Sequence, residues 1–265
     1  PHNRLLQKLL HYGINGSTFG WIAAFLNGRT QRVVLNGCKS GWAPVISGVP
    51  QGTVLGPLLF LIYINDVVTN VNSEIRLFAD DCILYRRIES TTDSQVLEND
   101  ITSLYLWSKT WQMDFNVSKC HTMSITRARQ RCDTQYYLGN ACLSIVNSFT
   151  YLGIEISSDL RWNNHVAAVV SKASRTLNFV RRNLYRCNSH IKELSYTTLV
   201  RPLLEYATAS WDPYSTQPAI SRIWRWSSGE LHVLWAVITV EPPVLLPYLI
   251  LWVGYLCRTG AAMHV

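Results

Sequence analysis

The segment Phe78-Ala79-Asp80-Asp81 places two adjacent carboxylates between two apolar runs. The apolar residues on either side are Ile75, Leu77, Ile83 and Leu84. Apolar runs around a short polar tip are typical of two strands joined by a tight turn, so the segment predicts a hairpin with the acids at its tip. Adjacent carboxylates repel each other unless hydrogen bonds, water or a cation offset their charge, and such oxygen ligands suit Mg²⁺. Because aspartate is favoured in turns, an ordinary solvated turn is the alternative.

The composition excludes some classes of protein. The 265 residues are 48% hydrophobic and 11% aromatic, which is enough for a packed core and argues against disorder. The seven cysteines form no CxxC pair and no cluster with histidine at zinc spacing, as is typical of a reduced intracellular protein. The formal net charge of +7 favours a polyanionic partner, either a nucleic acid or an anionic membrane surface.

Hydrophobic spacing divides the first 65 residues into helices and a hairpin. The helices expected from this spacing are Asn3–Gly13, Ser17–Leu26 and Thr53–Asn65. Two strand-like runs, Arg32–Leu35 and Trp42–Ile46, flank Asn36–Gly41, and the glycines of that linker indicate a hairpin.

A glycine-rich loop, Ser47–Gly52, precedes the third of these helices. Gly48 and Gly52 allow the backbone to lie close to a ligand or a partner strand, and the amide of Gln51 can both donate and accept hydrogen bonds. A plain turn into a helix is the alternative interpretation, because glycine and proline are common at such positions.

The run from Trp162 to about Tyr185 predicts an amphipathic helix with one basic side. Its apolar stripe consists of Val166, Val169, Val170, Ala173, Leu177, Val180 and Leu184. The basic residues opposite the stripe are Lys172, Arg175, Arg182 and, if the helix extends, Arg186. A solvated basic face is the alternative to a binding surface. A second helix, capped by Ser189 and interrupted at Pro202, is expected to pack on the first through Ile191, Leu194, Leu199, Leu203 and Leu204.

Taken in order, these motifs resemble the reverse transcriptase of non-LTR retrotransposons of the jockey-like and LINE type. The segments that carry the resemblance are Ser47–Phe60, Asn65-Asp66, Phe78–Asp81, Trp107 and Trp111, Asn116–Cys120 and Tyr151–Ile154. Asn116–Cys120 is similar to the lysine motif of that family, and Tyr151–Ile154 is similar to its primer-grip hairpin. The resemblance extends from Pro1 to about Tyr214.

The resemblance implies an α+β fold, a right-hand polymerase with an antiparallel palm sheet backed by helices and a helical thumb. It implies that Asp80 is a ligand of the two catalytic Mg²⁺ or Mn²⁺ ions, that Asp81 is its acidic neighbour and assists the metal site or the primer end, and that Lys119 supplies charge or a proton to the departing pyrophosphate. Two metal ions assist the attack of a primer 3′ hydroxyl on a nucleotide by activating the attacking oxygen and stabilising the leaving oxygens.

The same resemblance implies contacts with an RNA template, a DNA primer and deoxynucleoside triphosphates. The residues implied at the nucleotide and template are Gly48, Pro50, Gln51, Gly52 and Phe78. The implied primer grip is Tyr151, Leu152 and Gly153. In a thumb, Lys172, Arg175, Arg182 and Arg186 would follow the phosphates of the template-primer duplex without reading its sequence. Because such an enzyme meets both RNA and chromosomal DNA, it implies an intracellular location, in the nucleus, the cytoplasm or both.

The chain departs from the family pattern at its beginning. The family's first catalytic aspartate lies just upstream of residues that Pro1–Leu6 resemble, and no Asp or Glu precedes Asp66. The resemblance therefore implies that this chain lacks that aspartate, the amino-terminal part of the palm and most of the fingers. Two functions are open: a reverse transcriptase domain that is inactive as this fragment, and a non-catalytic nucleic-acid-binding remnant of a decayed element.

The expected organisation is a partial palm and fingers over residues 1–157, a helical thumb over 158–215 and an apolar tail over 216–265. Only Arg222, Arg225 and Arg258 of the 24 lysines and arginines follow Ser215. The tail has three interpretations: a membrane span near Val244–Cys257, a buried extension of palm or thumb, or translation in a shifted frame or an unspliced flank. The favoured one is the third. The stretch after Pro247 is shorter than the ~20 residues that cross a bilayer, so no stable membrane association is expected.

Overall fold

The computed structural model describes residues 1–126, 134–211 and 248–253. These residues form two units, and each unit is described by itself. The first unit contains residues 1–123, 134–145 and 248–253. The second unit contains residues 124–126 and 146–211.

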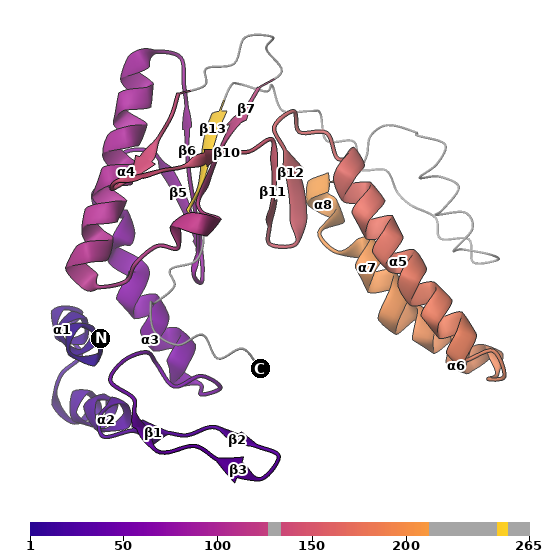
Figure 1. Cartoon of the computed structure of the whole chain (residues 1–265), viewed down its shortest axis with the longest axis horizontal. Coiled ribbons are helices and arrows are strands. Elements are labelled where there is room, and N and C mark those ends of the chain that lie inside the picture. The colour runs from indigo at the N-terminus through magenta and orange to yellow at the C-terminus, as the bar shows by residue number, and fades with distance from the viewer. Residues whose placement is uncertain (127–133, 212–247, 254–265) are drawn as a thin grey trace. The chain divides into compact units, whose positions relative to one another are not determined.

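The first unit begins with three helices that the sequence predicts (Figure 1). They are α1 (His2–His11), α2 (Gly16–Leu26) and α3 (Leu55–Ile64), and α3 continues into a 3₁₀ helix, η1 (Asn65–Val68). Their apolar faces share one core, in which Leu9 and Leu26 are fully buried and Leu59 is nearly so. Pro57 lies in the first turn of α3, where its missing N–H is not needed by the helix.

A hairpin follows α2, but its turn is tighter than the sequence prediction. The strands are β1 (Thr30–Gln31), β2 (Val34–Leu35), β3 (Cys38–Lys39) and β4 (Ala43–Pro44). Leu35 pairs with Cys38, so Asn36-Gly37 alone forms the turn and Cys38–Lys39 belongs to a strand. Both turn residues have positive φ, 49° and 82°, which suits the twist of a two-residue hairpin. The prediction of a six-residue linker, Asn36–Gly41, was therefore wrong.

A five-stranded sheet with the order β10-β7-β13-β6-β5 forms the centre of the first unit. The strands are β5 (Glu74–Phe78), β6 (Asp81–Arg87), β7 (His121–Ile125), β10 (Ser144–Ile145) and β13 (Tyr248–Val253). β5 and β13 both pair antiparallel with β6, as an antiparallel sheet requires. β10 pairs parallel with β7, however, so the sheet is mixed. The parallel pair arises because the chain passes through a separate small hairpin, β8 (Tyr137–Leu138) and β9 (Ala141–Cys142), before returning beside β7.

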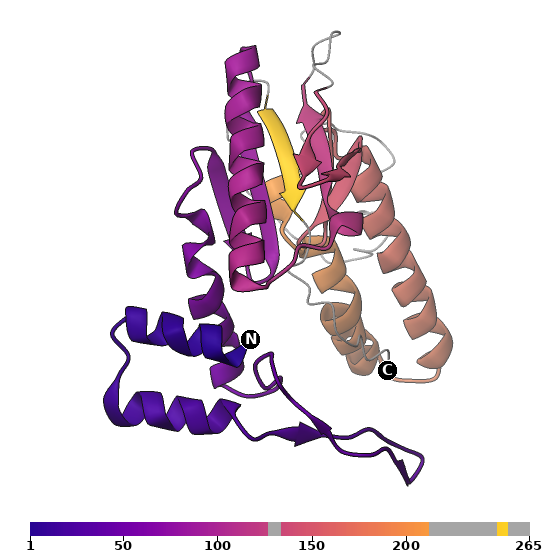
Figure 2. The same cartoon turned by 60° about the vertical axis from the view of Figure 1, so that its left-hand side comes forward.

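The long helix α4 (Thr91–Trp111) covers one face of this sheet (Figure 2). Ser90 caps its first turn, because the Ser90 hydroxyl accepts from the backbone N–H of Asp93 and the Asp93 carboxylate accepts from the N–H of Ser90. The packed side of α4 buries Leu97, Ile101 and Leu104 completely. The helix that covers this face of the sheet therefore has a start fixed by a capping box.

The apolar tail contributes one described element, the strand β13. Its residues pair with β6 from Tyr248 opposite Arg87 to Val253 opposite Cys82. Of the three interpretations of the tail, such a strand would correspond to a buried extension of the palm. The rest of residues 216–265 lies outside the described residues. No helix within the described ranges is both long and apolar enough to cross a bilayer. The origin of the tail stays a prediction.

The second unit consists of a hairpin and a group of helices. Its elements are β11 (Ser148–Tyr151), β12 (Ile154–Ser157), α5 (Asn163–Asn183), α6 (Ser189–Ser195), a π-helix η3 (Tyr196–Val200), α7 (Arg201–Glu205) and α8 (Thr208–Trp211). The predicted apolar stripe of α5 is confirmed: Val166, Ala173 and Val180 are buried. Its other members, Val169, Val170, Leu177 and Leu184, are half-buried.

The second predicted helix of this unit is present but differs in two respects. Asn188 rather than Ser189 is the cap, because its side-chain oxygen accepts from the N–H of Ile191. The helix is also divided: α6 changes to the π-helix η3, and α7 begins just before Pro202, which confirms the expected break. Val200 and Leu204 supply most of the contact with α5. Of the predicted packing residues, Leu203 and Leu204 do pack in this cluster, whereas Ile191, Leu194 and Leu199 are exposed.

Candidate active site and nucleic-acid interface

Asp80 and Asp81 lie at the tip of the hairpin formed by β5 and β6. Phe78 pairs with Asp81, so Ala79-Asp80 is a two-residue turn. Ala79 has a φ of 50°, a left-handed conformation that alanine adopts at a cost of about 1 kcal/mol. The predicted hairpin is confirmed, and both aspartates are half-buried rather than fully solvated.

The surroundings of Asp81 disfavour its charged form. Partial burial is the main cause that raises the pKa of Asp81, the neighbouring charge of Asp80 adds to it, and the charge of Lys119 acts in the opposite direction. One carboxylate oxygen of Asp81, Oδ1, is buried and accepts no hydrogen bond from any described residue. A buried oxygen of this kind beside a second carboxylate suits a divalent cation with oxygen ligands.

Lys119 is brought to the same site by the segment that precedes β7. The side chain of Asn116 accepts from the N–H of Ser118 at 3.2 Å and starts a short 3₁₀ helix, η2 (Val117–Lys119). Lys119 is the exposed last residue of this turn and is close enough for its charge to act on Asp81. Cys120 behind it is buried and fixes the turn against the core. Lys119 therefore lies where its charge reaches Asp81, and the catalytic role of the three residues stays a prediction.

The acid pair by itself would be an incomplete set of ligands for a metal ion. Within the described part of the chain, no three His, Cys, Asp or Glu side chains gather into a metal-binding group. Asp80 and Asp81 fit a divalent cation in the nature of their oxygen atoms, and the buried Oδ1 of Asp81 supports that fit. They supply two carboxylates of the larger set that such a cation takes.

The glycine-rich loop is held by its own residues against the start of α3. Gly48 and Gly52 have φ of 80° and 79°, so both require the left-handed conformation that glycine adopts freely. The hydroxyl of Thr53 donates to the carbonyl oxygen of Pro50 at 2.7 Å and accepts from the N–H of Gly56 at 3.1 Å. A Cβ atom at position 56 would lie 2.7 Å from that same carbonyl oxygen, so the close approach needs a glycine.

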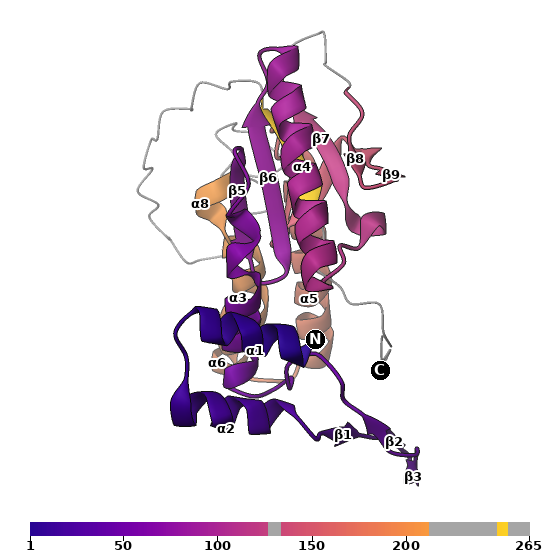
Figure 3. The same ribbon diagram turned by 90° about the vertical axis from the view of Figure 1, so that its left-hand side faces the viewer.

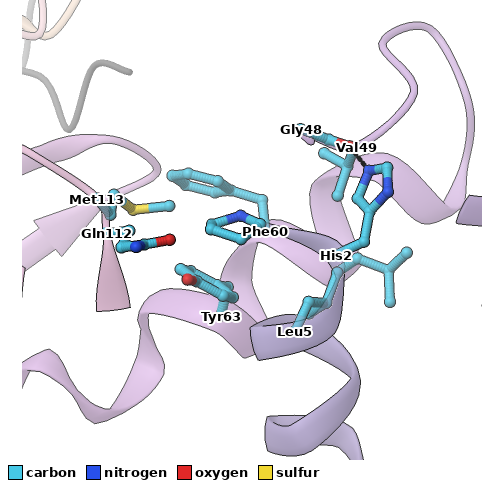
Figure 4. Close-up of a pocket in the computed structure, with 10 residues that line it drawn as sticks. His2, Leu5, Gly48, Val49, Phe60, Tyr63, Gln112 and Met113 are labelled. Atoms are coloured by element: carbon cyan, nitrogen blue, oxygen red, sulfur yellow. Dashed lines mark hydrogen bonds between the residues drawn. The ribbon is translucent and has the colours of Figure 1, made fainter. Parts of the chain in front are cut away.

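His2 joins this loop to the first helix, and sequence reasoning did not find it. Its Nε2 atom is 2.8 Å from the carbonyl oxygen of Gly48, and its side chain is buried (Figure 4). A cavity of about 90 Å³ lies beside this contact. Its lining includes Leu5, Val49, Leu59, Phe60, Tyr63 and Met113. Gln51 is exposed beyond the anchored end of the loop.

A buried lysine is the second feature that the sequence did not reveal. The Nζ atom of Lys8 donates to the carbonyl oxygen of Tyr63 and to the carboxylate of Asp66, both at 2.5 Å. It also lies 3.8 Å from the ring centroid of Trp111 and 4.8 Å from that of Trp107. The lysine side chain is only 3% exposed. In the sequence, Lys8 lies among the leucines of the first predicted helix, and their spacing does not indicate that the lysine side chain is buried.

The hairpin proposed as a primer grip lies in the second unit. Tyr151 pairs with Ile154 across the turn Leu152-Gly153, whose φ values are 47° and 80°. The hydroxyl of Tyr206 donates to the carbonyl oxygen of Leu152 at 2.8 Å and so holds the turn. The sequence correctly predicts a hairpin at these residues, and α8 and α7 flank the tyrosine that fixes it.

The basic side of α5 is exposed as its sequence predicts. Lys172, Arg175 and Arg182 all lie in the helix with exposed side chains. Arg186 lies beyond the end of α5 at Asn183, where its guanidinium group stacks on the ring of Tyr185 at 5.1 Å. The helix therefore does not extend to Arg186, but that side chain is also exposed.

With this geometry in place, comparison with known proteins identifies the class. The sequence profile of the family described as reverse transcriptase (RNA-dependent DNA polymerase) matches residues 1–156, which is more than half of the chain. The chain belongs to this reverse transcriptase family. Within the family it resembles the enzymes of jockey-like and X-element-like non-LTR retrotransposons.

Three relatives illustrate this similarity. The RNA-directed DNA polymerase from mobile element jockey of Drosophila melanogaster is 28% identical over 164 residues, which are 58% of this chain and 18% of the relative. The protein of the same name from Drosophila funebris is 28% identical over 224 residues, or 78% of this chain and 24% of the relative. The probable RNA-directed DNA polymerase from transposon X-element of Drosophila melanogaster is 29% identical over 170 residues, or 62% and 19%. The chain thus spans about a fifth of the length of these relatives.

Proposed function

We propose that the chain is part of the RNA-directed DNA polymerase domain of a non-LTR retrotransposon, which adds nucleotides to a primer 3′ hydroxyl by a two-metal mechanism. One observation supports this most directly: in a chain of this family, Asp80 and Asp81 lie at the tip of a hairpin, where the charge of Lys119 acts on Asp81. Residues 1–157 would be the partial palm and fingers, and residues 158–215 the thumb.

Asp80 and Asp81 are the residues that would hold Mg²⁺ or Mn²⁺. When bound, such ions activate the attacking hydroxyl and stabilise the leaving oxygens. Asp81 is suited to this role because its partial burial makes its charge costly unless a cation is near. The charge of Lys119, exposed beside Asp81, would favour the departing pyrophosphate. Phe78 is 58% exposed next to the pair and offers a flat apolar surface to a nucleotide or template base.

The remaining site residues would position nucleic acid and nucleotide. Gly48, Pro50 and Gly52 shape the loop that presents the exposed Gln51. Tyr151, Leu152 and Gly153 would hold the primer end. The substrates would be an RNA template, a DNA primer and deoxynucleoside triphosphates, and the enzyme would act inside the cell, in the nucleus, the cytoplasm or both.

The 265-residue polypeptide alone is expected to have no polymerase activity. It contains no Asp or Glu before Asp66, so its metal site would lack the first catalytic aspartate of the family, and most of the metal affinity and geometry would be lost. Primer extension with Mg²⁺ or Mn²⁺ should not exceed that of an Asp80→Asn control. Extension above the control would contradict this expectation.

Nucleic-acid binding tests the proposal without requiring activity. Replacing Lys172 and Arg175 by glutamine should reduce the salt dependence of binding to a template-primer duplex, with the logarithmic slope falling by about 1.8 for two lost phosphate contacts. Arg201→Gln is a suitable control, because Arg201 is paired with Glu205 at 2.6 Å. An unchanged slope in the double variant would remove α5 from the proposed interface.

A non-catalytic nucleic-acid-binding remnant of a decayed element is the second candidate. The observation that favours it is the exposed basic side of α5, which needs no metal site to bind phosphates. The genomic sequence immediately before the codon for Pro1 separates the two candidates. An in-frame strand that carries an aspartate supports the polymerase, and a stop codon or unrelated sequence supports the remnant.

A further inference from the structure

The hairpin arm, defined as residues 29–46, extends away from helices α1 and α2 of the first unit (Figure 3). Every residue from Arg29 to Pro44 is exposed. Two short ladders pair Val34 with Lys39 and Gln31 with Ala43, and the turn Asn36-Gly37 has the backbone of a tight two-residue hairpin. An ordered arm that contributes nothing to the core is suited to contacting a partner.

The arm carries positive charge that nothing nearby neutralises. Its cations are Arg29, Arg32 and Lys39, and no Asp or Glu precedes Asp66 in the sequence. Among the described residues, none of these three side chains forms an ion pair. Arg76, Arg87 and Lys109 of the same unit do pair with carboxylates. The charge of the arm is therefore available to a polyanion.

One exposed aromatic ring of the arm, that of Trp42, lies against one of these cations. The guanidinium group of Arg32 lies 4.4 Å from the ring centroid of Trp42, which is 63% exposed. Lys39 pairs with Val34 nearer the tip of the same arm, so the arm carries this cation beyond the contact between Arg32 and Trp42. At the base of the arm, the guanidinium group of Arg29 lies 5.6 Å from the ring of Phe25.

This combination fits a single-stranded nucleic acid. Unpaired bases stack on exposed aromatic rings and arginine planes while lysine and arginine contact the phosphates. A duplex keeps its bases stacked inside and offers mainly phosphates, so it would gain little from Trp42. An acidic polypeptide would satisfy the charge, but it would leave the exposed indole ring without a flat partner.

We propose that the hairpin arm binds single-stranded RNA through Arg32, Lys39 and Trp42. This inference rests on the proposed function and deepens it, because the arm would take an unpaired part of the template. It is independent of the acid pair and of the basic side of α5, which is proposed to contact duplex.

Fluorescence anisotropy of the full chain with labelled oligouridine and with a labelled template-primer duplex tests the proposal. The double variant Arg32→Gln/Lys39→Gln should reduce the salt slope for oligouridine by about 1.4. Trp42→Ala should raise the dissociation constant for oligouridine about tenfold, and Trp42→Phe should restore most of it. Neither variant should change duplex binding more than about twofold, because the duplex is held elsewhere.

The charge-matched control is Arg87→Gln/Arg201→Gln, which removes two exposed arginines that are each paired with a glutamate. This control should leave both slopes unchanged. The arm residues are exposed, so thermal unfolding followed by circular dichroism should be the same in all variants.

Four results would overturn the inference. If the arm variants bind oligouridine like the unaltered chain while the Lys172→Gln/Arg175→Gln variant loses duplex binding, the arm has no role and the proposed function stands. Equal losses for oligouridine and duplex would contradict the preference for single strands. Competition by polyglutamate as effective as that by unlabelled oligouridine would point to an acidic protein. Failure of the unaltered chain to bind either nucleic acid would overturn the arm and the proposed function together.

Discussion

Two clusters in the first unit contain the same kind of contact between a cation and an aromatic ring, but one cluster is buried and the other is exposed. The buried cluster consists of Lys8 with Tyr63, Trp107, Trp111 and the carboxylate of Asp66. The exposed cluster consists of Arg32 stacked on Trp42 in the hairpin arm, with no acid beside it. Both clusters place a cation on an indole ring.

The difference between the clusters lies in burial and in the acid. The side chain of Lys8 is 3% exposed, so its charge would be very costly without Asp66 and the hydrogen bond to the carbonyl oxygen of Tyr63. The cluster joins α1 to the end of α3 and, through the Trp107 indole that donates to Asp66 at 3.0 Å, to α4. Arg32 keeps its hydration and joins no elements. A cation–aromatic contact thus stabilises the fold in the first case and is free for a partner in the second.

The largest effect is expected from Asp66→Asn. This change leaves the ammonium group of Lys8 buried without its anion, so the free energy of unfolding should fall by about 3 kcal/mol. Urea unfolding followed by tryptophan fluorescence measures it. Glu205→Gln, which breaks the exposed pair with Arg201, is the control and should cost less than about 1 kcal/mol. Equal effects of the two changes would mean that burial does not distinguish the clusters.

A smaller loss is expected from Lys8→Met. Asp66 is 31% exposed and still accepts from the Trp107 indole, so losing the lysine leaves an acid that solvent can reach. The methionine also keeps most of the apolar contact with the rings. The free energy of unfolding should fall by about 1 to 2 kcal/mol in the same urea experiment. A loss larger than that of Asp66→Asn would reverse the proposed asymmetry.

The pH dependence of stability reports on the same lysine. Burial lowers the pKa of Lys8 from 10.5, although the hydrogen bond and the charge of Asp66 act to raise it. Between the lowered value and 10.5, the unfolded chain binds more protons than the folded chain, so the free energy of unfolding should rise with pH. Urea unfolding at successive pH values up to 10.5 should show this rise in the unaltered chain relative to Lys8→Met. Parallel curves for the two proteins would indicate that burial does not prevail over the pairing with Asp66.

The smallest effect on stability is expected in the exposed cluster. Arg32→Gln and Trp42→Ala should each change the free energy of unfolding by less than about 0.5 kcal/mol, because neither side chain packs in the core. The same unfolding experiment measures this, with Asp66→Asn as the sensitive reference. A loss near that of Lys8→Met would show that the arm is structural and would weaken its assignment to RNA binding.

Local patterns in the sequence predicted most of the elements that carry the candidate site. Alternation around Phe78–Asp81 gave the acid hairpin, and the 3.6-residue period gave α5 with its basic side, because both patterns reflect contacts between residues close in sequence. Boundaries that depend on hydrogen bonds were less accurate. The turn of the hairpin arm consists of Asn36-Gly37 alone, not of the six residues predicted, and the cap of α6 is Asn188, not Ser189. Several neighbouring residues can form a turn or a cap, so the sequence does not specify which of them does.

The sequence by itself determined the presence of the acid pair at a turn, the glycine loop before an apolar helix and the excess of basic residues. The tertiary structure alone decided that Lys8 turns inward to Asp66, that His2 holds the loop at Gly48, and that Tyr248–Val253 pairs with β6. These contacts join residues 46 to more than 100 positions apart, and no periodic pattern encodes which polar group will meet which across such a distance. Packing selects them, because a buried cation or carbonyl must find whichever partner the neighbouring helix or loop brings to it.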